Sequence, residues 1–319
     1  MSVPAKVPQS RSAAGAGVPI YSGPVPAGVN VDVVRDLVSL HLPEFTIADV
    51  VACGEGQDNV AFDVDGELIV RFRKAADDAA RAALVTAEAH LLEEIAGALP
   101  VAVPEIVFVD AERGCLAYRR LPGTPLLKQP RASRSAWAEA VGEVLGRSLA
   151  AMHALSPARM AAFVGTDDAP LPEWRSDAAD IYRDVADGIP ASDRPAIETF
   201  LAAEPPPRVA RLVFSHNDLG IEHVLVAPSS GALTGIIDWS DAAMVDPAYD
   251  VGLLYRDLGP VALDALLRSG LGAGDGGLRE RAIFYARCSV LEDLAYGRES
   301  GRPEYVDKSL AALGWLFEQ

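Results

Sequence analysis

The periodicity of the apolar residues changes once along the chain, at Leu121-Pro122-Gly123, and this change limits the folds that the chain can adopt. After it, apolar residues recur at helical spacing, most clearly over residues 136–155. Strand-like segments followed by helical ones predict an α+β protein, with an N-terminal lobe over residues 29–120 and a larger, mainly helical lobe over 121–319. The strand-like segments cluster or alternate β-branched and aromatic residues, and they are 46–52, 60–64, 68–72, 106–109 and 115–118.

The N-terminal lobe is expected to contain an antiparallel sheet and a helix over residues 79–98. Asp65-Gly66 predicts a two-residue hairpin turn within this sheet. Residues 1–28 are rich in Pro, Ala, Gly and Ser, and we expect them to form a disordered tail. Further helices are expected over residues 31–40, 136–155, 178–187, 196–203, 251–269, 278–296 and 304–317.

Two short apolar segments, residues 224–226 and 233–237, flank a turn in the second lobe. If they pair antiparallel, His223 at the start of the first lies opposite Asp238 at the end of the second. Asp218 lies five residues before His223, in the loop that leads into this hairpin. The pairing therefore gathers three polar side chains at one open end.

These three side chains suit phosphoryl transfer. The reaction needs a carboxylate that orients the attacking hydroxyl and accepts its proton, and a divalent metal that neutralises charge on the β- and γ-phosphates. We expect Asp218 to take the first role, and Asp238 and His223 to bind Mg²⁺. His216 is expected to brace the loop by a hydrogen bond. Asp250 is expected either to brace the same loop or to cap a helix.

Six short motifs follow one another along the chain: Gly54-Glu55-Gly56-Gln57-Asp58-Asn59, Val70-Arg71-Phe72-Arg73, Ala117-Tyr118-Arg119-Arg120-Leu121-Pro122-Gly123, His216-Asn217-Asp218, Gly235-Ile236-Ile237-Asp238-Trp239 and Asp246-Pro247-Ala248-Tyr249-Asp250. With this set, residues 46–319 resemble the antibiotic phosphotransferases, a family with the bilobal protein-kinase-like fold. His223 stands where that family more broadly has Asn. The aminoglycoside 2″- and macrolide 2′-phosphotransferases look similar to this chain in having His there.

The resemblance implies that ATP or GTP donates the phosphoryl group. Arg71 stands where kinases have a lysine, and its guanidinium can pair with phosphate oxygens and with Glu88, which is otherwise an ordinary solvated helix residue. A bulky aromatic such as Tyr118 goes with GTP use in the aminoglycoside 2″ group, so both nucleotides remain open. The implied nucleotide-binding residues are Gly54, Gly56, Asp58, Asn59, Arg71, Glu88, Tyr118, Arg119 and Leu121.

The acceptor implied by the resemblance is an aminoglycoside. Residues 291–302 resemble the C-terminal helix of the aminoglycoside 2″-phosphotransferases, whose acidic residues hold ammonium groups, and this implies contacts from Asp257, Glu292 and Asp293. The net charge of −17 also favours a cationic ligand. Arg256 is unfavourable in such a pocket, and residues 99–104 and 121–125 resemble the macrolide 2′-phosphotransferases. A macrolide kinase is therefore the alternative, and a catalytically inactive kinase-like binding module is a further one.

The same negative charge argues against nucleic acid and acidic lipid as partners. No apolar run approaches the roughly 18 residues of a membrane span. Three scattered cysteines, Cys53, Cys115 and Cys288, are too few for a disulfide framework. The cysteines indicate a reducing cytosol, and we expect a cytoplasmic monomer; the resemblance implies that its partner is a small-molecule antibiotic.

Overall fold

The structure, a computed structural model, describes residues 28–56, 59–75, 77–209, 211–272 and 274–317. These residues fold as two compact units. The smaller unit contains residues 28–98 and 102–121, and the larger unit contains Leu99–Val101 and the chain from Pro122 onward. The tail expected over residues 1–28 lies outside the described residues except for Gly28.

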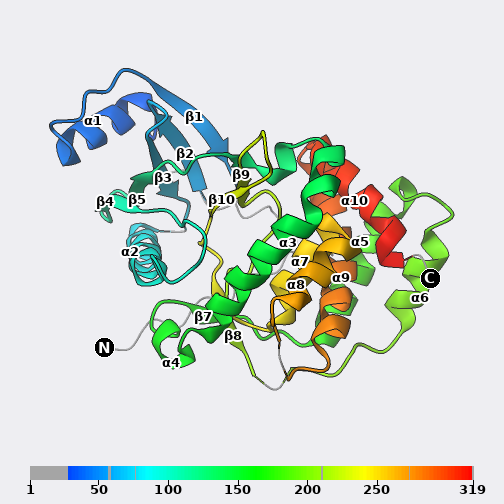
Figure 1. Cartoon of the computed structure of the whole chain (residues 1–319). Helices are drawn as coiled ribbons and strands as arrows, with labels where there is room; N and C mark the ends of the chain where they lie inside the picture. The colour runs from blue at the N-terminus through cyan, green and yellow to red at the C-terminus, as the bar shows by residue number, and fades with distance from the viewer. Residues whose placement is uncertain (1–27, 57–58, 76, 210, 273, 318–319) are drawn as a thin grey trace. The chain divides into compact units, whose positions relative to one another are not determined.

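The smaller unit is built on a five-stranded antiparallel sheet with the strand order β1-β2-β3-β5-β4 (Figure 1). Along β3, Val70 and Phe72 face one side of the sheet, and Ile69 and Arg71 face the other. The strands are β1 (Val50–Glu55), β2 (Asn59–Val64), β3 (Leu68–Arg73), β4 (Ile106–Asp110) and β5 (Cys115–Arg119).

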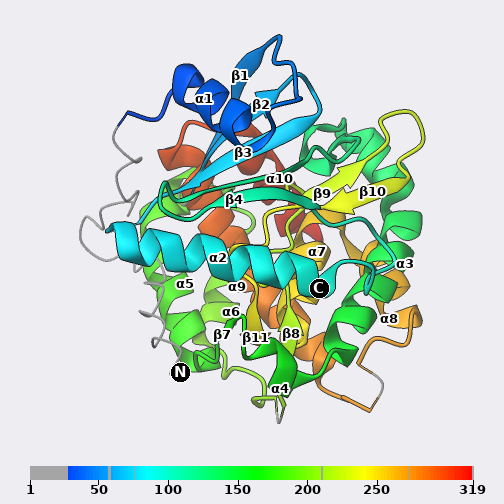
Figure 2. The same cartoon turned by 90° about the vertical axis from the view of Figure 1, so that its left-hand side faces the viewer.

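One helix covers each face of this sheet. Helix α1 (Val31–His41) packs on the face of Val70 and Phe72. Helix α2 (Asp78–Ile95) packs on the opposite face, where Val85 contacts the cluster that includes Tyr118. Figure 2 shows α2 as the long helix beside β4. The predicted sheet and its helix are therefore confirmed.

The start of the sheet differs from the prediction because Asp65 binds the preceding segment. Its carboxylate accepts hydrogen bonds from the main-chain N–H groups of Ala48, at 3.0 Å, and Asp49, at 2.6 Å. These N–H groups are therefore not available to a neighbouring strand, and β1 begins at Val50 rather than at residue 46. The predicted two-residue turn is also wrong, because Val64 pairs with Leu68 and leaves three residues between the strands.

The larger unit is mainly helical, as predicted. Helix α9 packs against α5, α7 and α10, and helix α3 packs along α8. The helices are α3 (Arg131–Ala154), α4 (Pro157–Met160), α5 (Leu171–Val185), α6 (Arg194–Ala202), α7 (Ala248–Leu258), α8 (Pro260–Arg268), α9 (Leu278–Glu299) and α10 (Pro303–Phe317). No helix among the described residues is both long enough and apolar enough to cross a membrane.

The single helix predicted over residues 251–269 is instead two helices, α7 and α8. Gly259 separates them with a φ of 79°, which favours glycine, and Pro260 has no N–H group to continue the hydrogen bonding of α7. Helix α3 begins five residues earlier than predicted, at Arg131. The polar residues of its first turn carry no apolar periodicity that could reveal this start.

Glycine allows α3 and α8 to approach each other closely. A Cβ atom at Gly142 would lie 2.8 Å from the main-chain oxygen of Ala262, and one at Gly146 would lie 2.8 Å from that of Leu266. Both distances are shorter than a carbon–oxygen contact allows, so the packing of these two helices requires glycine at both positions.

Two small three-stranded sheets lie among these helices and position the loop of residues 216–223. The first has the order β10-β9-β6 and contains the predicted hairpin, and the second has the order β7-β11-β8. The sequence analysis did not predict β8 and β11, which have three residues each. The strands are β6 (Thr124–Pro125), β7 (Gly165–Thr166), β8 (Val213–Ser215), β9 (Val224–Val226), β10 (Leu233–Ile236) and β11 (Ala243–Val245).

Candidate active site

The hairpin of β9 and β10 has a register that differs by one residue from the prediction. The main-chain N–H of Ile237 donates to the oxygen of His223 at 3.0 Å, so Ile237, rather than Asp238, is the partner of His223. A bulge between Leu233 and Gly235 shifts the pairing by one residue and so brings Ile237 opposite His223. Starting from the pair of Leu233 and Val226, the predicted pairing of His223 with Asp238 would need a shift of two residues.

The three predicted side chains nevertheless come together at the open end of the hairpin. Asp238 directly follows Ile237 with a φ of 63°, in the left-handed region. Its Oδ2 atom lies 3.8 Å from Nε2 of His223, and Oδ2 of Asp218 lies 3.5 Å from Nδ1 of the same ring. The imidazole of His223 therefore lies between two carboxylates.

The hydrogen bonding of His223 decides which ring nitrogen can bind a metal. Nδ1 donates to the main-chain oxygen of Asp218 at 2.8 Å, and because a carbonyl oxygen only accepts, Nδ1 carries a hydrogen atom. In the neutral ring, Nε2 then presents its lone pair on the side of Asp238. A carboxylate oxygen and an imidazole nitrogen on the same side form a donor set that fits a divalent metal ion.

The charge of His223 also depends on its surroundings. Burial by itself lowers the pKa of His223, but the carboxylates of Asp218, Asp238 and Glu222 outweigh this effect and raise it to about 9. The ring is therefore a cation near neutral pH and balances the carboxylates beside it. A metal ion bound at Nε2 would replace one proton at this position.

Asp218 has the exposure that a catalytic base needs, since 46 % of its side chain remains accessible. Partial burial raises the pKa of the Asp218 carboxyl, and the charge of His223 lowers it. The carboxylates of Asp241 and Glu222 raise this pKa further. A carboxylate with a raised pKa accepts a proton more readily.

Asp250 holds the main chain of the loop that carries Asp218. It lies in the first turn of α7 and is almost completely buried. Its carboxylate accepts hydrogen bonds from the N–H groups of Asn217, at 2.9 Å, and Leu219, at 3.1 Å, and from the hydroxyl of Ser215. The N-cap of α7 is Pro247, so Asp250 is a brace of the loop rather than a cap.

His216 joins the same loop to the end of the hairpin. Its Nε2 donates to the main-chain oxygen of Ile237 at 3.0 Å, and the ring is completely buried against Trp239, with ring centroids 4.8 Å apart. Asn217, next to it, has a φ of 62°, which is unusual for a residue other than glycine. The loop thus keeps a strained main-chain conformation that hydrogen bonds from α7 and from His216 stabilise.

The predicted nucleotide-binding residues lie in the smaller unit. Nη1 of Arg71 donates to Oε1 of Glu88 at 2.9 Å, and both side chains are about 6 % exposed. The main-chain N–H of Gly56 donates to the oxygen of Asn59 at 2.9 Å at the end of the β1-β2 hairpin. A Cβ atom at Gly54 or Gly56 would have no atom within 4 Å, so both glycines border open space. Asp58 lies outside the described residues.

A buried lysine ties this hairpin to β3. Nζ of Lys74 donates to Oε1 of Glu55 and to the main-chain oxygen of Gly56, both at 2.9 Å. Of the three residues predicted near the hinge, Tyr118 is buried, Arg119 is exposed and Leu121 is half-buried. The side chain of Tyr118 lies on the α2 face of the sheet, in one cluster with Val85 and Leu116.

The acidic residues predicted to bind substrate differ in their surroundings. Asp257 accepts hydrogen bonds from Arg256 at 2.8 and 2.9 Å and from Lys308 at 3.0 Å, while Asp293 lies 2.7 Å from Nζ of Lys308. Both carboxylates therefore belong to a buried ion network, in which a substrate amine would compete with Arg256 and Lys308. Glu292 is half-buried on α9, next in sequence to Asp293.

Lys308 and Glu222 complete this network at 3.4 Å, and the sequence interpretation missed both. A signal was present for Lys308, because it shares the apolar face of α10 with Tyr305 and Ala312. A charged residue at such a position needs a buried partner of opposite charge. Asp257 also accepts a hydrogen bond from the N–H of Ile221 at 3.2 Å, which links the network to the loop of residues 216–223.

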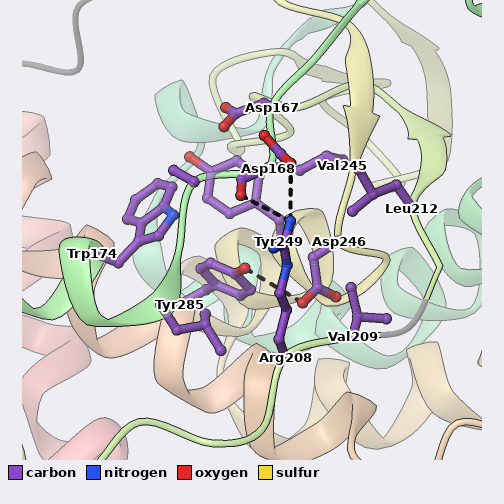
Figure 3. A pocket seen from close by; sticks show the side chains of 12 residues that line it. Asp167, Asp168, Trp174, Arg208, Val209, Leu212, Val245, Asp246, Tyr249 and Tyr285 are labelled. Carbon is purple, nitrogen blue, oxygen red and sulfur yellow. Dashed lines mark hydrogen bonds and ion pairs between the residues drawn. The ribbon is translucent and has the colours of Figure 1, made fainter.

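A small pocket of about 20 Å³ is lined by residues from the first turns of α5 and α7 (Figure 3). Trp174, Tyr249 and Tyr285 form part of its wall, with ring centroids 5.2 to 5.4 Å apart. Figure 3 shows the guanidinium of Arg208 bonded to Asp168. A volume of this size holds about one water molecule, so the pocket does not accommodate a substrate in this conformation.

The chain is similar to known phosphotransferases. A sequence model described as the phosphotransferase enzyme family matches residues 49–285. Viomycin phosphotransferase of Streptomyces vinaceus is 27 % identical over 286 residues, which cover 87 % of this chain and 96 % of that protein.

Two solved structures show the same fold. The GDP and kanamycin complex of APH(2″)-IIIa has a TM-score of 0.64 at 22 % identity, covering 88 % of this chain and 96 % of that one. The apoenzyme of macrolide 2′-phosphotransferase from Brachybacterium faecium has a TM-score of 0.59 at 24 % identity, covering 89 % and 98 %.

Proposed function

This chain belongs to the phosphotransferase enzyme family, and on that premise we propose that it transfers the γ-phosphoryl group of ATP or GTP to a hydroxyl group of an aminoglycoside antibiotic and so confers resistance. The observation that carries the proposal is the position of His223 between the carboxylates of Asp218 and Asp238. A half-exposed base beside a pair of metal ligands is what phosphoryl transfer to an alcohol requires.

Asp218 is the proposed catalytic base. The acceptor hydroxyl donates a hydrogen bond to its exposed carboxylate, which fixes the direction of the attacking oxygen. As that oxygen bonds to the γ-phosphorus and the bond to the leaving nucleoside diphosphate breaks, its proton passes to Asp218. Asp250 contributes by holding the main chain on both sides of Asp218 in place.

Asp238 and Nε2 of His223 are the side chains that would hold Mg²⁺. The ion supplies positive charge to the β- and γ-phosphate oxygens when it is bound. Magnesium prefers oxygen ligands, whereas Mn²⁺ accepts imidazole more readily. We therefore assign Asp238 the main share of metal binding and expect His223 to make the site tolerant of Mn²⁺.

In the smaller unit, Arg71 supplies charge for the α- and β-phosphates, and Glu88 fixes the direction of its guanidinium. Tyr118 limits the space available to the nucleobase of the donor. A nucleoside triphosphate donor also implies that the enzyme works in the cytoplasm. The choice between ATP and GTP is part of the test below.

The negative charge around Asp218 supports a cationic acceptor. The carboxylates of Asp241 and Glu222 raise the pKa of Asp218. Burial and the carboxylates of Glu292 and Asp167 raise the pKa of Tyr249. The amino groups of an aminoglycoside would be attracted by these carboxylates. The relative from Streptomyces vinaceus makes viomycin the second acceptor to examine.

The test is to incubate the purified chain with Mg²⁺, ATP or GTP, and one of kanamycin, gentamicin, viomycin or erythromycin, and to measure phosphate gain by mass spectrometry. Phosphate on kanamycin or gentamicin supports the proposal. Phosphate on erythromycin alone would replace it with a macrolide kinase. Nucleotide binding without transfer to any acceptor would favour a binding module instead.

A further inference from the structure

A second cavity, of about 210 Å³, lies within the larger unit. Its walls come from the first turns of α3, the junction of α7 and α8, and one face of α10, the helices drawn in green, yellow-orange and red in Figure 1. We call it the α3–α10 cavity. The residues on which the argument rests are Arg131, Arg134, Asp257, Lys308 and Trp315.

The charge of this cavity is opposite to that of the chain as a whole. Arg131 and Arg134 line the cavity together with Lys308 and Asp257, and the last two already pair with each other, so the two arginines leave the site positive although the chain carries a net charge of −17. Positive charge gathered in a concave site, in a protein that is otherwise acidic, is typical of a site for an anion.

The two arginines have few partners of their own. Within the described part of the chain, Arg131 forms no ion pair, and Arg134 donates one long hydrogen bond of 3.4 Å, to the main-chain oxygen of Leu127. Burial lowers the pKa of Arg134, Asp257 opposes this, and the charge of Arg131 lowers it further. The two guanidinium groups therefore repel each other across the cavity, and an anion between them would remove that repulsion.

Asp257 cannot supply that negative charge, because other groups already use it. Its two oxygens accept hydrogen bonds from Arg256, from Lys308 and from the N–H of Ile221. The negative charge that would balance Arg131 and Arg134 must therefore come from a bound group that is not part of the chain.

Two helices also direct their N-terminal ends at the cavity. Helix α3 begins at Arg131 after Pro130, and α8 begins at Pro260 after Gly259, and neither has a side chain that caps its first turn. Uncapped N–H groups and the positive end of the helix dipole favour negative charge nearby. This adds to the attraction by the arginines.

We propose that the α3–α10 cavity binds a small organic anion, whose phosphate or carboxylate group lies between Arg131 and Arg134 and whose apolar part contacts the indole of Trp315. The site reaches the catalytic loop through Lys308 and Asp257, because Lys308 contacts Glu222 and Asp257 holds the N–H of Ile221. Occupancy of the cavity is thereby linked to the loop that carries Asp218.

The experiment is a titration of the full chain with phenyl phosphate, with the heat of binding measured by isothermal calorimetry. ADP and Mg²⁺ are kept saturating so that phosphate binding at the nucleotide site does not contribute. We expect one saturable site. Arg131→Gln and Arg134→Gln should each weaken the binding about ten- to a hundredfold, as expected for loss of a charge-assisted hydrogen bond.

The matched control is Arg268→Gln, which removes an exposed arginine of α8 that pairs with Glu139 at 2.6 Å. It should leave the affinity unchanged. Arg131 is exposed, so Arg131→Gln tests the proposal even if Arg134→Gln proves unstable. The absence of saturable binding to the wild type, or equal affinities of the wild type and Arg131→Gln, would overturn the proposal.

Discussion

Arg71 and Glu88 form an ion pair of 2.9 Å inside the smaller unit, between β3 and α2, where almost no water reaches either side chain. Breaking a buried pair by removing one partner leaves an uncompensated charge, which is more costly than removing both. The pair therefore offers a way to separate stability from nucleotide binding.

Glu88→Leu should lower the free energy of unfolding by about 3 kcal/mol, because it leaves Arg71 buried without its carboxylate. Arg71→Met combined with Glu88→Leu should recover most of this loss in urea denaturation, yet raise the KM for the nucleotide. A double variant that keeps the wild-type KM would show that Arg71 does not contact the phosphates.

Asp218→Asn should reduce kcat by about 10²- to 10⁴-fold, because the amide cannot accept the hydroxyl proton. The Kd of the nucleotide, measured by calorimetry, should remain within about twofold of the wild type, since the phosphate contacts are unchanged. Asp264→Asn, in an exposed pair with Arg279, is the control and should alter neither quantity. Unchanged turnover of Asp218→Asn would refute the role of base.

His223→Asn should retain activity but change the metal preference. The amide oxygen suits Mg²⁺ better than imidazole does, so the ratio of kcat/KM with Mn²⁺ to that with Mg²⁺ should fall. The measurement is a titration of activity with each metal. The same ratio in the wild type and in the variant would mean that His223 is not a ligand.

His153 should make the stability depend on pH. It lies in α3, with Nε2 3.5 Å from Oγ of Ser215, and burial lowers its pKa from 6.5 to about 4 against a weaker opposing effect of Asp250. Between pH 6.5 and 4 the unfolded chain therefore binds more protons at this residue than the folded one. The contribution of His153 is fully present above pH 6.5 and is lost as the pH falls toward 4.

The comparison that isolates this effect is between the wild type and His153→Gln, which does not titrate. From pH 7 to pH 4.5, the free energy of unfolding from urea denaturation should fall by about 2 kcal/mol more in the wild type than in the variant. Parallel pH profiles would show that His153 does not remain neutral in the folded protein.

Gly142→Ala should destabilise the larger unit by about 1 to 3 kcal/mol, because the new methyl group would meet the main-chain oxygen of Ala262. Gly276→Ala is the matched control, since a Cβ atom there meets no atom within 4 Å. Thermal unfolding of the two variants gives the comparison. Equal midpoints would mean that α3 and α8 can separate slightly without loss.

The parts of the fold that the sequence predicted are those with local signals. The sheet of the smaller unit and helices such as α9 and α10 follow from apolar periodicity, and the proximity of the side chains at 218, 223 and 238 follows from short-range pairing in a hairpin. Gly259-Pro260 was a visible stop signal, but the apolar periodicity continued across it and concealed the break between α7 and α8.

The parts that could not be predicted depend on contacts between residues far apart in the chain. The ion network joins Glu222 in a loop to Asp257, Asp293 and Lys308 on three different helices. Arg256, taken alone, suggested a site unsuited to cations. Its partners became visible only in the folded structure, where Arg256 neutralises Asp257 and Asp293.

Helix α7 holds the catalytic loop at two levels, with Asp250 on the N–H groups of Asn217 and Leu219 and Asp257 on that of Ile221. These two carboxylates are seven residues apart, about 10 Å along the helix axis, so they hold the loop of residues 216–223 from points about two helical turns apart on α7. The main chain around Asp218 therefore keeps its conformation as long as α7 stays folded. On heating, catalytic activity should consequently be lost at the temperature at which the hydrophobic interior melts cooperatively. No active, partly melted state should exist.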